Sequence, residues 1–203
     1  MKKILLFFLF QSSIYAQTYY DVDYNEIDKS TFDKFLFDKQ FYYAENDSLN
    51  AFKILNRHER GEVGTLDDVE AFFKELNKRL NLNLDSTKPL IIYYYPGKDP
   101  CNSGGKYNIR REYLKSDKEL AKKVKAITDV NVLRIYKNKE GIKTLKDHDW
   151  RKDPNALIEN LFFNFHYSCE SFVVINKSKY SAFFGEYSHD EVTENLKEIL
   201  AKQ

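Results

Sequence analysis

The chain contains two cysteines, and the apolar segments beside them indicate where they lie in the folded protein. Cys101 belongs to a short polar loop that follows the apolar run Leu90–Tyr95. Cys169 stands just before a second apolar run, Phe172–Ile175. A buried strand that ends in a polar loop presents a thiol at the edge of a sheet. A thiol in that position can bond to another cysteine or, as a thiolate, attack a disulfide.

The N-terminus has the pattern of an export signal. A basic pair, Lys2 and Lys3, precedes the apolar stretch Ile4–Phe10, and a region of small residues ends at Ala16. This pattern predicts a signal peptide over residues 1–16, and hence an exported, periplasmic or secreted protein without a transmembrane segment after cleavage. Outside the cytoplasm, two cysteines favour one disulfide. Two free thiols, or one reactive and one buried thiol, are the alternatives.

The composition excludes some classes of partner. Basic and acidic residues nearly balance, at 32 against 31 in 203 residues, and they are interspersed along the chain. No clustered basic face is therefore expected for nucleic acid or for a membrane surface. The chain has only 7 glycines and 4 prolines, and 16% of its residues are aromatic, which favours a packed globule over disorder.

Apolar runs and helix-capping residues predict alternating strands and helices. Residues 17–30 are expected to form an extended or loosely docked arm, and Gly61–Gly64 a break. Strands joined through helices should run parallel, and a closing hairpin should add antiparallel strands. The apolar runs predict strands at 41–44, 49–55, 90–95, 130–136, 172–175 and 180–184. The capping residues predict helices that begin at Thr65, Ser116, Asp153 and Ser188.

This order of elements, with a cysteine at the end of the second strand from residue 49, resembles the thioredoxin fold. Residues 171–200, SFVVINKSKYSAFFGEYSHDEVTENLKEIL, look like the closing hairpin and helix of that fold. Residues 113–120 resemble exported thioredoxin-like proteins whose active-site helix breaks and restarts. The resemblance implies an α/β fold, a three-layer α/β/α sandwich with a mixed central sheet, over residues 49–203. Residues 17–48 would form an N-terminal extension.

The redox motif of that family is altered in this chain. The Cys-x-x-Cys frame reads CNSG over residues 101–104, so that a glycine replaces the second cysteine. Glu170 stands where the family has a cis-proline, and a trans peptide bond is expected there because a cis bond before a non-proline residue costs about 2.5–4 kcal/mol. We therefore expect a thioredoxin-like binding or accessory module with a degenerate redox site and an unknown protein or peptide partner.

The resemblance also implies that the loop carrying Cys169 packs against Cys101, which favours a disulfide between them. That bridge is either structural or a redox-active pair in which Cys169 resolves Cys101. The alternative functions are an atypical thiol–disulfide oxidoreductase with Cys101 as nucleophile, and a structural envelope protein that docks through residues 17–48. An external thiol would complete the cycle if Cys101 acts alone.

A groove for an extended peptide is a further implication of the resemblance. Its expected lining is Tyr95, Asn102, Ser103 and Glu170, although strand tyrosines such as those at 93–95 more commonly pack in a core. Peptide recognition without chemistry is physically reasonable at such a groove.

The histidines suggest two other hypotheses. His166, three residues before Cys169, either tunes a thiolate or interacts with the last carbonyls of a helix over 154–166, which is the simpler interpretation. The segment Asp147–Asp149, with Asp153 nearby, offers possible metal ligands. Zinc usually needs four converging ligands, so we expect a polar loop and no metal site. No phosphate-binding glycine motif occurs, and no cofactor is expected.

Overall fold

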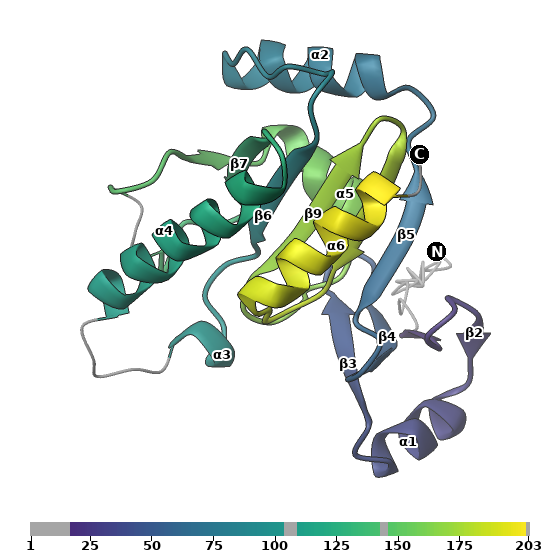
Figure 1. The fold of residues 1–203 in the computed structure, drawn as a ribbon. Coiled ribbons are helices and arrows are strands. Elements are labelled where there is room, and N and C mark those ends of the chain that lie inside the picture. The colour runs from purple at the N-terminus through teal and green to yellow at the C-terminus, as the bar shows by residue number, and fades with distance from the viewer. Residues whose placement is uncertain (1–16, 104–108, 143–145, 202–203) are drawn as a thin grey trace, which may run out of the picture.

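The computed structural model describes residues 17–103, 109–142 and 146–201. These residues form a mixed α/β fold with two mixed sheets and six α-helices (Figure 1). The predicted signal peptide, residues 1–16, and Gly104 lie outside the described residues. Among the helices that are described, none combines the length and the apolar character that a membrane span requires.

Residues 17–56 build the smaller sheet, to which helix α1 (Lys29–Phe37) is joined. The segment 17–30, expected as an extended or loosely docked arm, is extended in β1 and β2 but is paired within this sheet rather than loosely docked. Aromatic side chains explain the difference, because Phe32 of α1 is buried with its ring 4.8 Å from that of Tyr19 and 6.3 Å from that of Phe52. The strand order is β2 (Glu26–Ile27), β1 (Thr18–Tyr20), β4 (Ala51–Asn56) and β3 (Phe41–Asn46), with β1 parallel to β4.

The larger, central sheet has six strands among the described residues, and its middle pairs are β9 with β6 and β6 with β7. Strands β6 and β7 are parallel, while β6 and β9 are antiparallel, and the predicted hairpin of β9 and β10 is confirmed. The strand order is β5 (Gly61–Thr65), β10 (Lys179–Phe183), β9 (Ser171–Asn176), β6 (Leu90–Tyr95), β7 (Asn131–Tyr136) and β8 (Trp150–Lys152).

The first strand of the central sheet is not the one that the sequence predicts. Strand β4, expected at 49–55, pairs within the smaller sheet, and its place is taken by β5, which was expected as a break. Gly64 lies opposite Tyr180, and a Cβ atom at Gly64 would lie 2.5 Å from the Tyr180 hydroxyl oxygen. The glycine thus makes room for a tyrosine ring within a strand rather than ending one. The expected boundary at residue 48 runs between β3 and β4, which pair with each other.

Two of the predicted helix starts, at Thr65 and Ser116, differ from the structure. Thr65 ends β5, and Asp68 caps α2 by accepting a hydrogen bond from the Ala71 N–H. Helix α4 continues through Ser116, whose hydroxyl lies 2.7 Å from Nε2 of His189 instead of capping a helix. The predicted start at Asp153 is confirmed, because Asp153 is the N-cap of a 3₁₀ turn that begins at Pro154, and its carboxylate also accepts hydrogen bonds from the N–H groups of Ile158 and Glu159 in α5. The helices are α2 (Val69–Leu80), α3 (Pro100–Ser103), α4 (Ile109–Ile127), α5 (Leu157–Phe162) and α6 (His189–Ala201).

Helices cover both faces of the central sheet, which explains the unbroken apolar run of β6. Ile92 packs with side chains of α2 and α5, whereas Ile91 packs with side chains of α4 and α6. Successive strand residues point to opposite faces, so a strand buried on both sides has no polar alternation. Helices α4 and α6 lie side by side over one face (Figure 1). The predicted cap of α6 is confirmed, because the Glu191 N–H donates to the Ser188 hydroxyl.

Candidate functional site

The two cysteines meet where β6 ends and β9 begins. Tyr94 and Ser171 are paired in this antiparallel register, so the loop after β6 and the loop before β9 lie at the same end of these two strands. The Cα atoms of Cys101 and Cys169 lie 5.3 Å apart, and the structure joins the two residues as a disulfide. That separation is within the usual range for a disulfide. Cys101 is exposed and Cys169 is half-buried.

Asp99 holds the two loops together. Its buried carboxylate accepts hydrogen bonds from the N–H groups of Asn102, at 2.9 Å, and Cys169, at 2.8 Å. The Asn102 side chain returns a hydrogen bond to the Gly97 carbonyl at 2.8 Å. Cys169 itself adopts a φ of 74°, a region that non-glycine residues rarely occupy. Asn102 therefore acts first as a loop brace, and Asp99 is a site residue that the sequence did not suggest.

His166 is also part of this arrangement. Helix α5 ends at Phe162, so the expected contact between His166 and the last carbonyls of a helix over 154–166 is wrong. Its ring Nε2 lies 3.3 Å from the Asp99 carboxylate, and its backbone N–H donates to the Glu45 carbonyl of the smaller sheet at 2.6 Å. The segment that carries Cys169 is thus tied to both sheets.

A cavity of about 270 Å³ opens beside the disulfide. Both cysteines line it, and so do Tyr95, Asn102 and Glu170. The side chain of Ser103 lies outside what the structure describes. Of the three consecutive strand tyrosines, Tyr94 stacks on Phe163 in the core at 4.7 Å between ring centroids, and its neighbours at 93 and 95 line the cavity while remaining largely buried.

A charged cluster lies beside the cavity, which two of its members, Asp117 and Arg134, line. A carboxylate oxygen of Asp117 lies 3.4 Å from the Arg134 guanidinium and 2.6 Å from Nε2 of His148. The guanidinium also lies over the Tyr93 ring, 5.3 Å from its centroid. Burial lowers the pKa of His148, and the nearby guanidinium lowers it further. The expected polar loop at 147–149 therefore contributes one side chain to this cluster.

Glu170 has the most perturbed carboxyl group of the site. Burial raises its pKa from 4.5 to about 7, and the negative charge of Asp117 adds to the effect. Arg134 and a hydrogen bond with Tyr187 act in the opposite direction and lower the pKa. Near neutral pH this carboxyl is therefore present in both protonation states, which is a property of groups that exchange protons.

Sequence patterns gave little warning of these charged residues. The one signal is Arg134, a charged residue inside the otherwise apolar strand β7. Asp117 belongs to a helix that is rich in charges, and nothing in its spacing distinguishes it from a solvent-facing residue.

Among the described residues, one further group of potential ligands lies at the mouth of the cavity. The sulfurs of Cys101 and Cys169 and a carboxylate oxygen of Glu186 are all within 4.8 Å of one another. While the two sulfurs are bonded to each other, neither is available as a thiolate ligand.

Comparisons of the chain with family models, with curated proteins and with solved structures gave no match. The function must therefore be inferred from the fold and from the chemistry of the site. That site is a disulfide between an exposed and a half-buried cysteine, beside a cavity lined by aromatic and carboxyl side chains.

Proposed function

We propose that this chain is an exported thioredoxin-like module that exchanges its Cys101–Cys169 disulfide with thiols of a peptide or protein partner. The observation that carries the proposal is the position of the Cys101–Cys169 disulfide, which lines a cavity through both residues and includes an exposed cysteine, Cys101. The central sheet supports it, since a buried strand delivers Cys101 and the closing hairpin delivers Cys169.

The exchange begins at the exposed sulfur. A partner thiolate attacks Sγ of Cys101, a new disulfide forms, and the electron pair of the broken bond leaves on Sγ of Cys169, which then takes up a proton. A second thiolate of the partner attacks the partner sulfur in this mixed disulfide and releases Cys101 as a thiolate. The partner dithiol has then lost two electrons and two protons, and the protein disulfide has become two thiols.

Glu170 is suited to transfer the proton that Cys169 takes up in this reaction. It follows Cys169 in the chain and lines the same cavity, and its pKa of about 7 leaves a neutral fraction at neutral pH. A neutral carboxyl group can donate a proton to the departing Cys169 thiolate, and a charged one can accept it in the reverse direction.

A second candidate function is peptide binding without exchange, with a bridge that only braces the two loops. The aromatic wall of the cavity favours it, because Tyr95, Tyr113 and Trp150 offer the kind of surface that binding sites use. Both candidates share the cavity, and they differ in whether the disulfide opens under native conditions.

The test is a redox titration of the protein purified from an oxidising compartment, followed by alkylation and intact mass. We expect millimolar reduced glutathione to open the bridge in the folded protein. We also expect Cys169→Ser to trap a mixed disulfide at Cys101, whereas Cys101→Ser traps much less. A bridge that resists millimolar thiols while the protein stays folded would reject exchange and leave peptide binding.

A further inference from the structure

The cavity beside the disulfide is walled by aromatic rings. Tyr93 and Tyr187 are stacked with their ring centroids 6.0 Å apart, and Tyr95 meets Trp150 edge-on at 6.2 Å. Tyr113 adds a fifth ring, which is about half exposed at the mouth. The faces of such rings attract cations, and the Tyr93 ring already carries the Arg134 guanidinium, 5.3 Å from its centroid.

Among the described residues of the lining, carboxyl groups outnumber lysine and arginine side chains. Asp117, Glu170 and Glu186 contribute acidic groups, and Arg134 is the one lysine or arginine among the described lining residues. Asp117 already pairs with that guanidinium at 3.4 Å. Glu170 and Glu186 form no ion pair within 4.0 Å among the residues that the structure describes. His189, the other basic group in the lining, is engaged with the Ser116 hydroxyl at 2.7 Å.

We propose that this cavity receives a lysine or arginine side chain of the partner, next to the cysteine that exchanges with Cys101. The inference rests on the proposed function, because the exchange is what brings the partner cysteine to Cys101. A basic side chain would lie among the rings and balance Glu170 and Glu186, which line the cavity together with Cys101 and Cys169. A neutral side chain gains only the apolar contact, and an acidic one is repelled.

The test uses three peptides, each with two cysteines and identical except for the residue beside the first one: lysine, norleucine or glutamate. The reaction of each reduced peptide with the oxidised protein gives a second-order rate constant. Each value is divided by the rate of the same peptide with glutathione disulfide, because a neighbouring charge changes the reactivity of the thiol itself. We expect the lysine peptide to react about tenfold faster than the norleucine peptide and to exceed the glutamate peptide by more.

The double variant Glu170→Gln/Glu186→Gln tests whether the cavity causes the preference. We expect the ratio of lysine to norleucine to fall close to one, whatever happens to the absolute rate. Glu70→Gln/Glu75→Gln on α2, on the opposite face of the central sheet, is the matched control and should keep the ratio. Equal rates for the three peptides, or a ratio that survives the cavity variant, would overturn the inference and leave exchange standing.

A binding measurement decides the inference even where no peptide reacts. The same three peptides with serine in place of both cysteines are titrated into the oxidised protein by calorimetry. Tenfold tighter binding of the lysine peptide than of the norleucine peptide supports the cation site independently of exchange. Equal affinities would reject it, and absence of reaction with all cysteine peptides would reject only the proposed exchange.

Discussion

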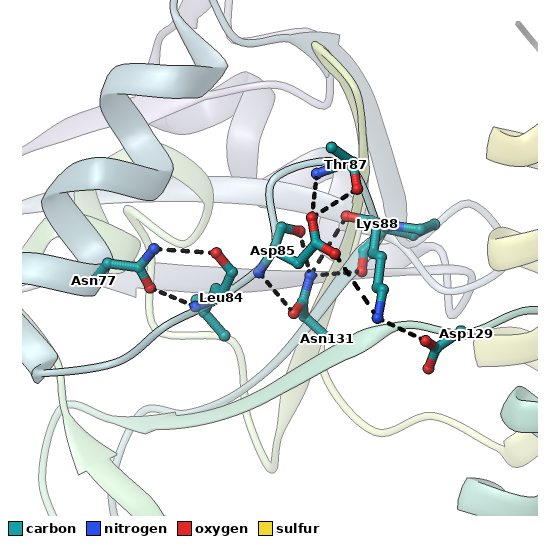
Figure 2. Close-up of polar contacts among 8 residues, drawn as sticks. Asn77, Leu84, Asp85, Thr87, Lys88, Asp129 and Asn131 are labelled. Atoms are coloured by element: carbon teal, nitrogen blue, oxygen red, sulfur yellow. Dashed lines mark hydrogen bonds and ion pairs between the residues drawn. The ribbon is translucent and has the colours of Figure 1, made fainter.

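The polar residues at the two ends of strand β6 differ in how fully they are paired. At the entry to the strand, Figure 2 shows a network in which side chains and backbone groups bind one another. At the exit, the described lining of the cavity holds more carboxyl groups than lysine or arginine side chains. The contrast is clearest in two carboxyl groups. The Thr87 hydroxyl lowers the pKa of Asp85 at the entry, whereas burial raises the pKa of Glu170 at the exit.

The entry network is made of reciprocal hydrogen bonds. The side chain of Asn77 both donates to and accepts from the backbone of Leu84, at 3.1 and 2.7 Å. Asn131 does the same with the backbone of Asp85, at 2.7 and 3.2 Å (Figure 2). Polar groups that satisfy each other fix a loop and need no ligand. A carboxylate left in a cavity without an ion pair is costly, and a bound partner or a proton can relieve that cost.

Removal of the disulfide should have the largest effect, and it should act at the exit of β6 and not at its entry. In Cys101→Ala/Cys169→Ala, thiol exchange is abolished, and the free energy of unfolding falls by roughly 4 kcal/mol, because the bridge closes a loop between residues 68 apart. Urea denaturation without reductant measures the loss. Wild-type protein in dithiothreitol should match the variant. Equal midpoints for the variant and the oxidised wild type would contradict the prediction.

Glu170→Gln should stabilise the protein at high pH. A folded pKa of about 7 against an ordinary 4.5 means that the folded state holds the proton more tightly than the unfolded state. The penalty is absent below about pH 4.5, grows up to pH 7 and then stays constant, at up to roughly 3 kcal/mol. We expect the variant to exceed the wild type in unfolding free energy at pH 8 and to equal it near pH 4.5.

Urea melts at both pH values give this difference, and the exposed Glu186 supplies the control. In Glu186→Gln, the difference in unfolding free energy between pH 4.5 and pH 8 should equal that of the wild type. A Glu170→Gln variant that is no more stable than the wild type at pH 8 would show that this carboxyl carries no penalty.

Asn77→Ala should weaken the hydrogen-bond network at the entry of β6 and leave the site at its exit unchanged. The change removes two hydrogen bonds to the backbone of Leu84, and we expect a loss of about 1–2 kcal/mol in unfolding free energy. Normalised rates of thiol exchange should remain those of the wild type. Asn83→Ala, at an exposed position in the same loop, is the matched control and should change neither quantity. Slower exchange in Asn77→Ala would mean that the two ends are coupled.

Lys88→Ala should have the smallest effect. The ammonium group lies 2.7 Å from the Asp129 carboxylate, but both side chains are well exposed. Such pairs contribute little to stability, so the urea midpoint should not move measurably at either low or high salt. A lower midpoint for the variant at low salt alone would show that the entry depends on charge as well as on hydrogen bonds.

Local signals in the sequence predicted the parts of the fold that depend on neighbouring residues. The apolar run 90–95 indicated a strand buried on both sides, and Ser188 with Glu191 indicated the start of α6. The sequence did not predict that β5, and not β4, belongs to the central sheet, because the sheet in which a strand pairs depends on residues far away in the chain. Ser116 misled because serine with a glutamate three residues later also occurs inside a helix, here where its hydroxyl contacts His189.

In the candidate site, too, some features were visible in the sequence and others depend on the fold. The positions of Cys101 and Cys169 beside their strands were visible in the sequence, as was the resemblance that placed Glu170 next to them. The pKa of Glu170 was not, because it follows from burial and from charges on α4 and β7 that only the fold brings together. Asp99 looked like an ordinary loop residue, although it accepts a hydrogen bond from the backbone of Cys169.

The strand order of the central sheet has a consequence for how the chain assembles during synthesis. Strand β5 ends at residue 65 and pairs in that sheet, among the described residues, with β10 alone, which begins at residue 179. The hairpin of β3 and β4 can form as soon as it is made, but β5 must wait until β10 has been synthesised, and such distant pairings are slow to form. Cys101 likewise waits for the residues that precede β9. Its pairing with Cys169 therefore requires synthesis beyond residue 169, and a nascent chain interrupted before that residue would carry an unpaired thiol.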